Sequence, residues 1–413
     1  MLHNRIIYFP RTIALCFLVF SEVLLLIGPF SYQISNYFLL YSYLVILNFA
    51  FYYGYQKGVR HFKPSEFKMR KDVIAFILIV GFLLTIRRLS SMWAGRGLAV
   101  TLYNLVYALQ NPGTVYLESV SLEGSVLTYL WLILEPVRWA AIPLGIANWK
   151  RFKYWIKAIV IATVLLEIIM WLGIGTRKGI FDVIIISFFL IIAKTPKLIT
   201  VKSERRKVLP IIVIAIVLFL GYFTISGASR KGYEMNEISS TIITQDIKPG
   251  YRDLPDWALF SLCSIESYLC QGYYALSKGL EIGVKPLTFG GSGWFTIMLM
   301  RKIGYDPEPY TYMASLESFG IDRSVNWHTM YLWLANDVSF FGVPFLVFII
   351  GFLFARSWLD VVEERNQASY PFFALMLIMV FYFYANNQVL SFSFMPFVFW
   401  LIFYLFTRSK RIS

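Results

Sequence analysis

Charged residues and cysteines are scarce in this sequence. Only 15% of its 413 residues are charged, and it contains three cysteines and three histidines. A soluble globular domain carries about 25% charged residues, so the low charge argues against a soluble protein. Three cysteines cannot form the disulfide framework of a small secreted protein. No cluster of histidines or paired cysteines offers the ligand set of a zinc site.

Apolar and aromatic residues are abundant instead. Hydrophobic residues make up 58% of the chain and aromatic residues 18%, and the mean hydropathy is +0.62. This composition excludes a disordered chain. Apolar runs recur from end to end, many of them near the roughly 20 residues that cross a bilayer. They predict an all-α polytopic membrane protein with about ten transmembrane helices, or ten to twelve.

The predicted spans are residues 12–30, 37–55, 73–86, 126–147, 157–174, 180–193, 208–226, 340–355, 371–387 and 388–406. The third and sixth apolar runs are short, so their helices are expected to extend a turn further. The first run is too long for the apolar core of a signal peptide and is expected to remain as a span.

Lysine and arginine in the connecting loops predict the orientation. The segments 57–71, 150–157 and 194–207 are rich in Lys and Arg and alternate with poorly charged connections. By the positive-inside rule these segments are cytoplasmic, and so are both termini. The net charge of +14 is then mainly a signal of topology, and nucleic acid is not an expected partner.

Two external loops are long enough to carry function. They comprise residues 87–125 and 227–339. The first belongs to an N-terminal transmembrane bundle (1–226). The second forms a large periplasmic loop domain (227–339), which C-terminal transmembrane helices (340–413) follow. The large loop contains helix-like spacing of bulky residues from Asp256 to Leu280. Cys263 and Cys270 lie about 10 Å apart on such a helix, too far for a disulfide, so both are predicted to be buried free thiols.

Cationic pairs stand at three outward span ends, where the positive-inside rule does not place them. These pairs are Arg87-Arg88, Arg177-Lys178 and Arg230-Lys231, the last two followed by glycine. Glycine lets the backbone approach a ligand closely, and Arg presents a planar fork of donors to phosphate oxygens. The pairs therefore indicate a membrane-anchored phosphate or diphosphate. The alternative is that they reach lipid headgroups or pair with local acids, as Lys178 could with Asp182 four residues on.

Ionisable residues inside predicted spans are costly and are candidates for function. Glu135 and Arg138 are spaced to pair at i,i+3 in the fourth predicted span, and Glu167 and Glu22 lie in others. A purely structural role for these groups stays open.

His328 is the one histidine predicted to be external. Imidazole titrates near neutral pH and can accept or donate a proton. His328 is therefore a candidate base, and the alternative is a structural hydrogen-bonding role.

The segment that begins at His328 carries a family resemblance. His328, Tyr331, Leu332, Asp337 and Gly342 match the pattern His-x-x-Tyr-Leu, acid, Gly. With the many spans, the late external loop and the Arg-Lys-Gly turns, this pattern resembles bacterial polysaccharide repeat-unit polymerases (O-antigen polymerases) and the related O-antigen ligases. Ser339 stands where the first glycine of the pattern is usual.

The resemblance implies a glycosyltransferase-C-like bundle in the bacterial inner membrane with its active site at the periplasmic face. Such an enzyme transfers the growing glycan from an undecaprenyl diphosphate donor to a new lipid-linked repeat unit, with inversion and without a cofactor or metal. Membrane lipids and a chain-length regulator are further expected partners. In this chain Arg177, Arg230, His328 and Asp337 would be catalytic, the arginines holding the diphosphate and His328 or Asp337 taking the proton.

Other side chains would bind substrate. They are Lys178, Lys231, Arg87, Arg88, Arg323 and Trp327. Trp294, Tyr310 and Tyr312 would stack on sugar rings or act as interfacial anchors. An O-antigen ligase, another lipid-linked glycosyltransferase and a lipid-linked oligosaccharide transporter stay as alternatives. A transporter is expected to show internal repeats and shorter external loops.

Overall fold

The computed structural model describes residues 4–92, 107, 126–173, 176, 178–204, 206, 210, 221, 246–323 and 326–409. Helices dominate this part of the chain. The longer helices are α1 (Asn4–Ile27), α2 (Tyr37–Arg60), α3 (Lys71–Met92), α6 (Val126–Ala147), α7 (Tyr154–Gly173), α8 (Lys178–Lys194), α11 (Asp256–Ile282), α14 (Met330–Glu363), α15 (Ser369–Phe381) and α17 (Phe394–Ser409). Shorter helices are α9 (Lys197–Thr200), α12 (Trp294–Lys302), α13 (Tyr312–Leu316) and α16 (Gln388–Phe392). The strands β1 (Phe30–Ser31) and β2 (Asp246–Ile247) pair antiparallel.

The all-α membrane architecture is confirmed in its coarse form. Five of the described helices are long and apolar enough to cross a membrane: α1, α2, α3, α7 and α14. The number ten is not confirmed. The helix α15 has 13 residues and so extends for about 20 Å, less than the roughly 30 Å apolar core of a bilayer. The predicted span 208–226 lies outside the described residues except for positions 210 and 221.

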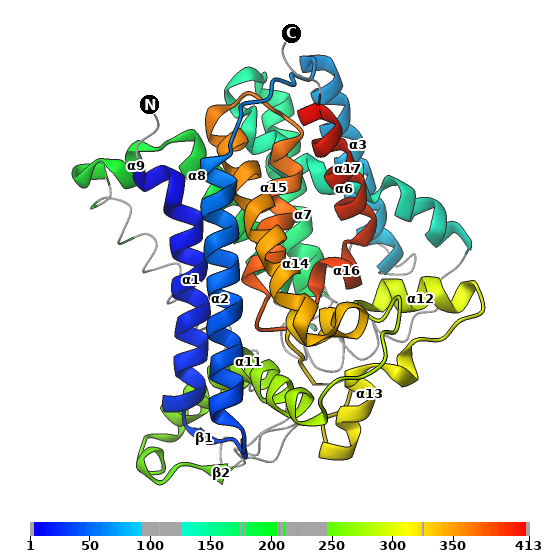
Figure 1. Ribbon diagram of the computed structural model, residues 1–413. Coiled ribbons are helices and arrows are strands. Elements are labelled where there is room, and N and C mark those ends of the chain that lie inside the picture. The colour runs from blue at the N-terminus through cyan, green and yellow to red at the C-terminus, as the bar shows by residue number, and fades with distance from the viewer. Residues whose placement is uncertain are drawn as a thin grey trace.

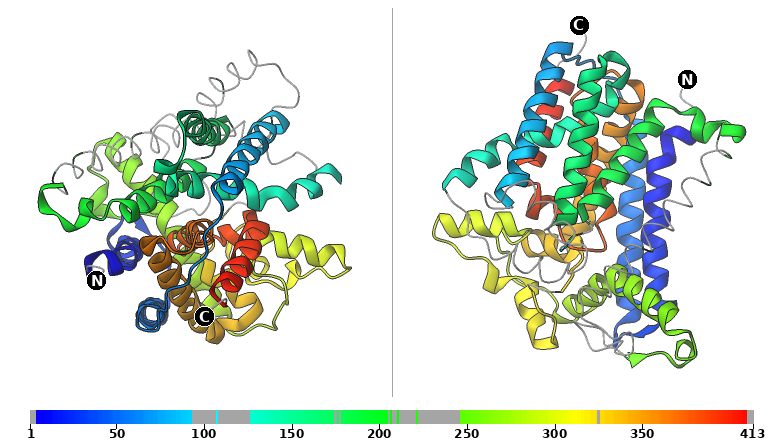
Figure 2. Two further views of the ribbon diagram at one scale, coloured as in Figure 1. Left: turned by 90° about the horizontal axis from the view of Figure 1, so that it is seen from above. Right: turned by 180° about the vertical axis from the view of Figure 1, so that it is seen from behind.

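The long helices form a bundle that is covered at one end (Figure 1). The helices α11, α12 and α13 lie across that end, and we call residues 246–323 and 326–338 the cap. The start of α1 and the end of α17 lie toward the opposite end, in the views of both Figure 1 and Figure 2. This arrangement agrees with an even number of crossings between the two helices.

The helix α14 joins the cap to the bundle through a kink. Its φ and ψ at Ser339 are 59° and 168°, a conformation populated almost only by glycine. The predicted boundary between residues 339 and 340 lies at this kink, where two helical segments within Met330–Glu363 meet at the non-helical Ser339. Sequence periodicity could not separate the two segments, because both are apolar and the first is buried within the cap.

Close packing of α2 against α14 depends on glycine. A side chain at Gly54 would collide with the main-chain carbonyl of Phe348, and one at Gly351 with that of Phe51. Gly54 and Gly58 form a Gly-x-x-x-Gly spacing, which lets two membrane helices bring their backbones together. The small residues therefore fix how near α14 lies to α2.

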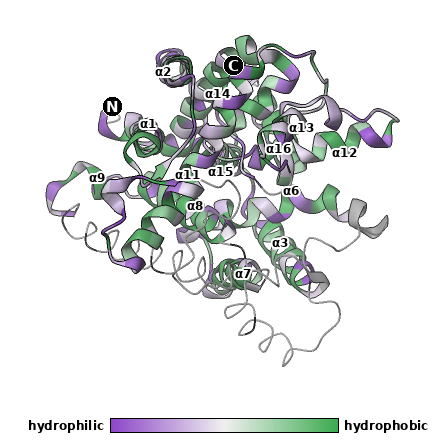
Figure 3. Ribbon diagram, turned by 90° about the horizontal axis from the view of Figure 1, so that it is seen from below, coloured by the Kyte–Doolittle hydropathy of each residue, from purple (hydrophilic) through white to green (hydrophobic). Residues whose placement is uncertain are grey.

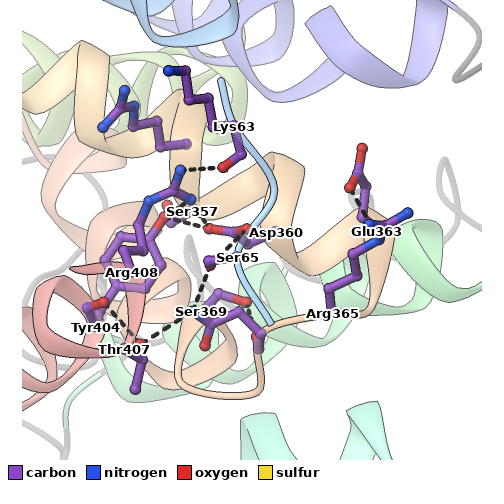
Figure 4. Close-up of polar contacts among 12 residues, drawn as sticks. Lys63, Ser65, Ser357, Asp360, Glu363, Arg365, Ser369, Tyr404, Thr407 and Arg408 are labelled. Carbon is purple, nitrogen blue, oxygen red and sulfur yellow. Dashed lines mark hydrogen bonds and ion pairs between the residues drawn. The ribbon is translucent and has the colours of Figure 1, made fainter. Parts of the chain in front are cut away.

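A buried carboxylate ties the bundle together at the end opposite the cap (Figure 4). Asp360 of α14 is fully buried. It pairs with Arg408 of α17 and accepts hydrogen bonds from the Tyr404 hydroxyl at 2.7 Å and from Ser65 at 3.3 Å. The Arg408 guanidinium also donates to the main-chain oxygen of Lys63 at 2.6 Å. One acid thus links α14, α17 and the connection between α2 and α3.

The cap is fastened to the turn between α1 and α2. Besides the β1–β2 pairing, the Phe30 amide donates to the buried Glu266 carboxylate of α11 at 2.8 Å. The predicted helix from Asp256 is confirmed as α11. Cys263 and Cys270 lie on it, both buried and neither in a disulfide, as predicted.

Candidate functional site

A charged cavity lies where α3, α6, α7, α8 and the α16–α17 connection meet. It has a volume of about 120 Å³, well above the roughly 10–15 Å³ that one water needs. Three cations and three acids line it: Arg88, Arg138, Lys178, Glu135, Glu167 and Asp182. Formally charged groups inside a membrane bundle are expensive and mark functional sites more often than not.

The ends of helices place these groups together. Arg88 lies in the last turns of α3, Trp171 in the last turn of α7, and Lys178 is the first residue of α8. The helix α16, which follows the end of α15 nearest the cap, contributes Phe392 to the lining. The cavity therefore lies at the cap end of the bundle, the side that the orientation analysis predicts to be external.

The predicted pair of Glu135 and Arg138 is confirmed and extends to a third residue. The Arg138 Nε lies 2.8 Å from Glu135 Oε2, and Arg138 Nη1 binds Glu167 Oε1. The Arg138 side chain is 8% exposed, so both acids share a cation that is shielded from water. The pairing offsets part of the desolvation cost of placing three charges between α6 and α7.

The predicted pair of Lys178 and Asp182 is also confirmed. The ammonium lies 5.8 Å from the Trp171 ring and 5.3 Å from the Tyr382 ring, within cation–π range. Only Oδ2 of Asp182 takes part in the ion pair. Oδ1 is buried and has no hydrogen-bond partner among the described residues, so it can accept a hydrogen bond from a ligand in the cavity.

The neighbouring arginines of α3 point to different surroundings. Both lie inside α3, which continues to Met92, whereas the sequence prediction places them after the end of a span. Arg88 lines the cavity, with Nη1 3.9 Å from Glu135 Oε1. The Arg87 guanidinium lies 3.3 Å from the Trp131 ring centroid. Of this pair, the cavity lining therefore includes Arg88 but not Arg87. Arg177, Arg230 and Lys231 lie outside the described residues.

His328 lies in the cap and is completely buried. Its main-chain amide donates to Asn386 Oδ1 at 2.9 Å, while neither ring nitrogen has a hydrogen-bond partner among the described residues. Burial lowers the pKa of His328 to about 4, although the charge of Asp322 acts in the opposite sense. The imidazole is therefore neutral at pH 7 and available as a proton acceptor.

Asp337 holds a loop of the cap. Its carboxylate accepts hydrogen bonds from Thr288 Oγ1 and the Gly290 amide at 2.7 Å, from the Gly291 amide at 3.0 Å and from both the amide and hydroxyl of Ser292. The connection between α11 and α12 is therefore a loop organised around this acid. Within the described residues no hydrogen bond joins Asp337 to His328.

A row of aromatic rings connects the His328 segment with the cavity. Trp327 lies 4.7 Å from Tyr268, which lies 6.3 Å from Tyr384. Tyr384 stacks on Tyr382 at 6.2 Å, and Tyr382 faces the Lys178 ammonium. The predicted cationic and histidine sites are thus separate places joined by one aromatic row.

The remaining candidates lie apart from the cavity. Arg323 pairs with Glu308 at 3.3 Å and Glu317 at 3.0 Å on the cap. Trp294 packs against Trp333 at 5.5 Å. Tyr312 is buried and donates to the main-chain oxygen of Gly283, whereas Tyr310 is 60% exposed.

In the sequence, Arg138 and Glu167 stand out as candidates for function. Asp182 stands out as a possible partner of Lys178, but the pattern assigns none of the three a catalytic or binding role. The signal was present, because each is ionisable and lies within a predicted span. What the spacing could not reveal is that α6, α7 and α8 bring them into one cavity.

No protein-family model matches this sequence, and neither a curated protein nor a solved structure is detectably similar to it.

Proposed function

We propose that this protein is a membrane glycosyltransferase that polymerises lipid-linked oligosaccharide repeat units. One observation carries the proposal: the cavity holds cations together with Asp182 Oδ1, a carboxylate oxygen that has no hydrogen-bond partner among the described residues. Glycosyl transfer from a lipid diphosphate requires both kinds of group. Cations stabilise the departing diphosphate, and a carboxylate accepts the proton of the attacking hydroxyl.

The cationic side chains would bind the donor. Arg88 and Lys178 line the cavity, and Arg177 is adjacent to Lys178 in sequence. An arginine can bind two phosphate oxygens at once, and a lysine supplies a compact charge. The three cations and three acids of the described lining cancel in formal charge, and Lys178 is already paired with Asp182. A bound diphosphate would therefore compete with Asp182 for the Lys178 ammonium. That exchange would release a carboxylate at the moment at which the substrate enters.

The proposed reaction is a direct displacement. The acceptor sugar hydroxyl would attack the anomeric carbon of the donor glycan while the bond from that carbon to the diphosphate oxygen breaks. Undecaprenyl diphosphate would leave with the electron pair, and the hydroxyl proton would pass to Asp182. Direct displacement inverts the anomeric centre. His328 is the second candidate for the base, for an acceptor hydroxyl that would bind at its ring in the cap, since a base must lie within hydrogen-bond reach of the proton. Arg230 and Lys231 are further candidates for diphosphate binding.

Chain growth in purified components tests the proposal. The protein is incubated in detergent with its lipid-linked repeat units, isolated from cells that lack it, and the products are separated by gel electrophoresis. A ladder of polymers is expected. His328→Ala and Asp182→Asn distinguish the two candidate bases, since only loss of the true base should abolish the ladder in correctly folded protein. If the wild-type protein forms no ladder, the polymerase assignment is wrong.

A transporter is the second candidate, favoured by the buried network of Glu135, Arg138 and Glu167. Charged groups of this kind line ion and substrate paths in membrane bundles. A transporter would move intact lipid-linked repeat units across proteoliposomes and leave their length unchanged. The same preparation can be tested for both activities.

A further inference from the structure

The helix α12 differs from its neighbours in direction and surface. It runs across the bundle and projects from its side, whereas α17 runs along the bundle (Figure 1). It has nine residues, about 13 Å of helix. Seen from the cap end, its apolar residues appear in green and its basic end in purple (Figure 3).

One face of α12 packs on the protein. Ile297 is 1% exposed, and Trp294 at the start of the helix contacts Trp333 of α14. The Phe295 ring stacks on Phe394 of α17 at 4.9 Å. These contacts hold the helix rigidly beside α16 and the beginning of α17.

The exposed side of α12 carries apolar and basic residues together, and Arg301 on it is paired with Asp306 and Glu308. Met298 is 52% exposed, Leu299 45%, and Ile303 just after the helix 72%. The basic residues Arg301 and Lys302 follow at its C-terminal end. Exposure of these three apolar side chains to water is unfavourable, and an apolar covering would remove that cost.

The exposed face continues onto α17. Phe392, Phe399, Ile402 and Phe406 are 68%, 47%, 61% and 54% exposed along α16 and α17, and the Phe295–Phe394 stack joins this surface to α12. An exposed apolar surface along a bundle helix of a membrane protein faces lipid. The lipid that covers α17 would therefore continue around the beginning of this helix and cover the exposed side of α12.

We infer that α12 is an interfacial helix that lies in the membrane surface on the cap side of the bundle. Met298, Leu299 and Ile303 would then lie among the parts of the acyl chains nearest the headgroups. Its orientation across the bundle, and an exposed side on which apolar residues stand beside a lysine, are features of helices that lie in the plane of a membrane. Lys302 lies at headgroup depth, where its ammonium meets lipid phosphates. The occupant of the face is therefore the bilayer rather than a second protein.

The inference places the cavity at a defined depth. The helix α12 packs on α16, and Phe392 of α16 lines the cavity. Immersion of α12 therefore sets the cavity at the level of the lipid headgroups. This inference does not depend on the reaction that the cavity performs, and its test requires no activity.

Depth-dependent fluorescence quenching tests the position of α12. A bimane label is attached to Leu299→Cys in a Cys16→Ser background, because Cys16 is the exposed native cysteine of the described residues. The full-length protein is reconstituted in phosphatidylcholine vesicles whose chains carry bromine at carbons 6,7 or at 11,12. Matched labels at Ile402→Cys, on lipid-facing α17, and at Ser318→Cys, on the exposed surface of the cap, give the lipid and water references.

The label at position 299 should be quenched by bromine at carbons 6,7 more than at 11,12, and little by aqueous iodide. The label at 402 should be quenched most by deep bromine, and the label at 318 by iodide alone. The inference is overturned if position 299 behaves like position 318. It is equally overturned if position 299 resists both quenchers, since a protein partner then covers the face. A label at Met298→Cys repeats the test if the first variant does not fold.

Discussion

Removing the shared cation between α6 and α7 should destabilise the protein strongly. Arg138 pairs with Glu135 and Glu167 while only 8% of its side chain is exposed. In Arg138→Met, Glu135 retains Arg88 at 3.9 Å. Glu167 retains only a contact of 3.5 Å with the Thr85 hydroxyl among its described partners. An uncompensated buried charge costs about 3–5 kcal/mol.

Substitution of Glu167, the partner of Arg138, should lower the free energy of unfolding by less. In Glu167→Gln the cation keeps Glu135, and the amide oxygen can still accept from Arg138, so we expect a loss of about 1–3 kcal/mol. The double variant Arg138→Met/Glu167→Gln buries no lone charge and should recover most of the stability lost in Arg138→Met. The non-additivity follows directly from the shared contact.

Thermal unfolding in detergent, followed by the fraction of protein that remains monodisperse after heating, measures these effects. Arg323→Met serves as the matched control, because Arg323 pairs with two acids at 35% exposure and surface pairs contribute below about 1 kcal/mol. The reasoning fails if Arg138→Met is no less stable than Arg323→Met. It also fails if the double variant is no more stable than Arg138→Met alone.

Three further substitutions test other parts of the structure. Ser339→Gly should stabilise the protein by about 1–3 kcal/mol in thermal unfolding, because glycine tolerates the positive φ at the α14 kink, whereas Ser339→Ala should give no gain. Gly54→Ala should cost about 1–3 kcal/mol by forcing α2 from α14, while Gly250→Ala, with nothing within 4 Å, should be neutral. Burial raises the pKa of Glu266 from 4.5 to about 8, so the unfolded chain releases this proton more readily and stability should fall between pH 5 and pH 8. Glu266→Gln, which keeps an acceptor for the Phe30 amide, should flatten that fall in melting temperature, and an unchanged pH profile would contradict it.

The sequence predicted the parts of this structure that depend on local periodicity. The fourth predicted span, residues 126–147, coincides with α6, and α11 begins at the predicted Asp256. The pairs Glu135–Arg138 and Lys178–Asp182 were predictable because both partners lie on one helix. The expected extension of the third and sixth spans is confirmed by α3 and α8.

Features that depend on contacts between distant segments were not predictable. The predicted last span, residues 388–406, is divided into α16 and α17 at Ser393, although both parts are apolar. The charged cavity arises where the C-terminal ends of α3 and α7 meet the middle of α6 and the beginning of α8, and the spacing of residues within one helix cannot predict such a meeting. His328 and Asp337 are nine residues apart, yet their surroundings differ: one is enclosed in the cap and the other organises the 288–292 loop.

The most direct test of the proposed function compares two lysines of the same helix. Lys178 lies in the cavity and pairs with Asp182, while Lys194 lies at the other end of α8 and pairs with Glu364 at 2.9 Å. Chain growth is measured with purified Lys178→Ala and Lys194→Ala proteins and lipid-linked repeat units, after both have been shown to be monodisperse. The account predicts that the first loses the polymer ladder and the second retains it. Equal ladders from the two variants would contradict the role of the cavity in glycan transfer.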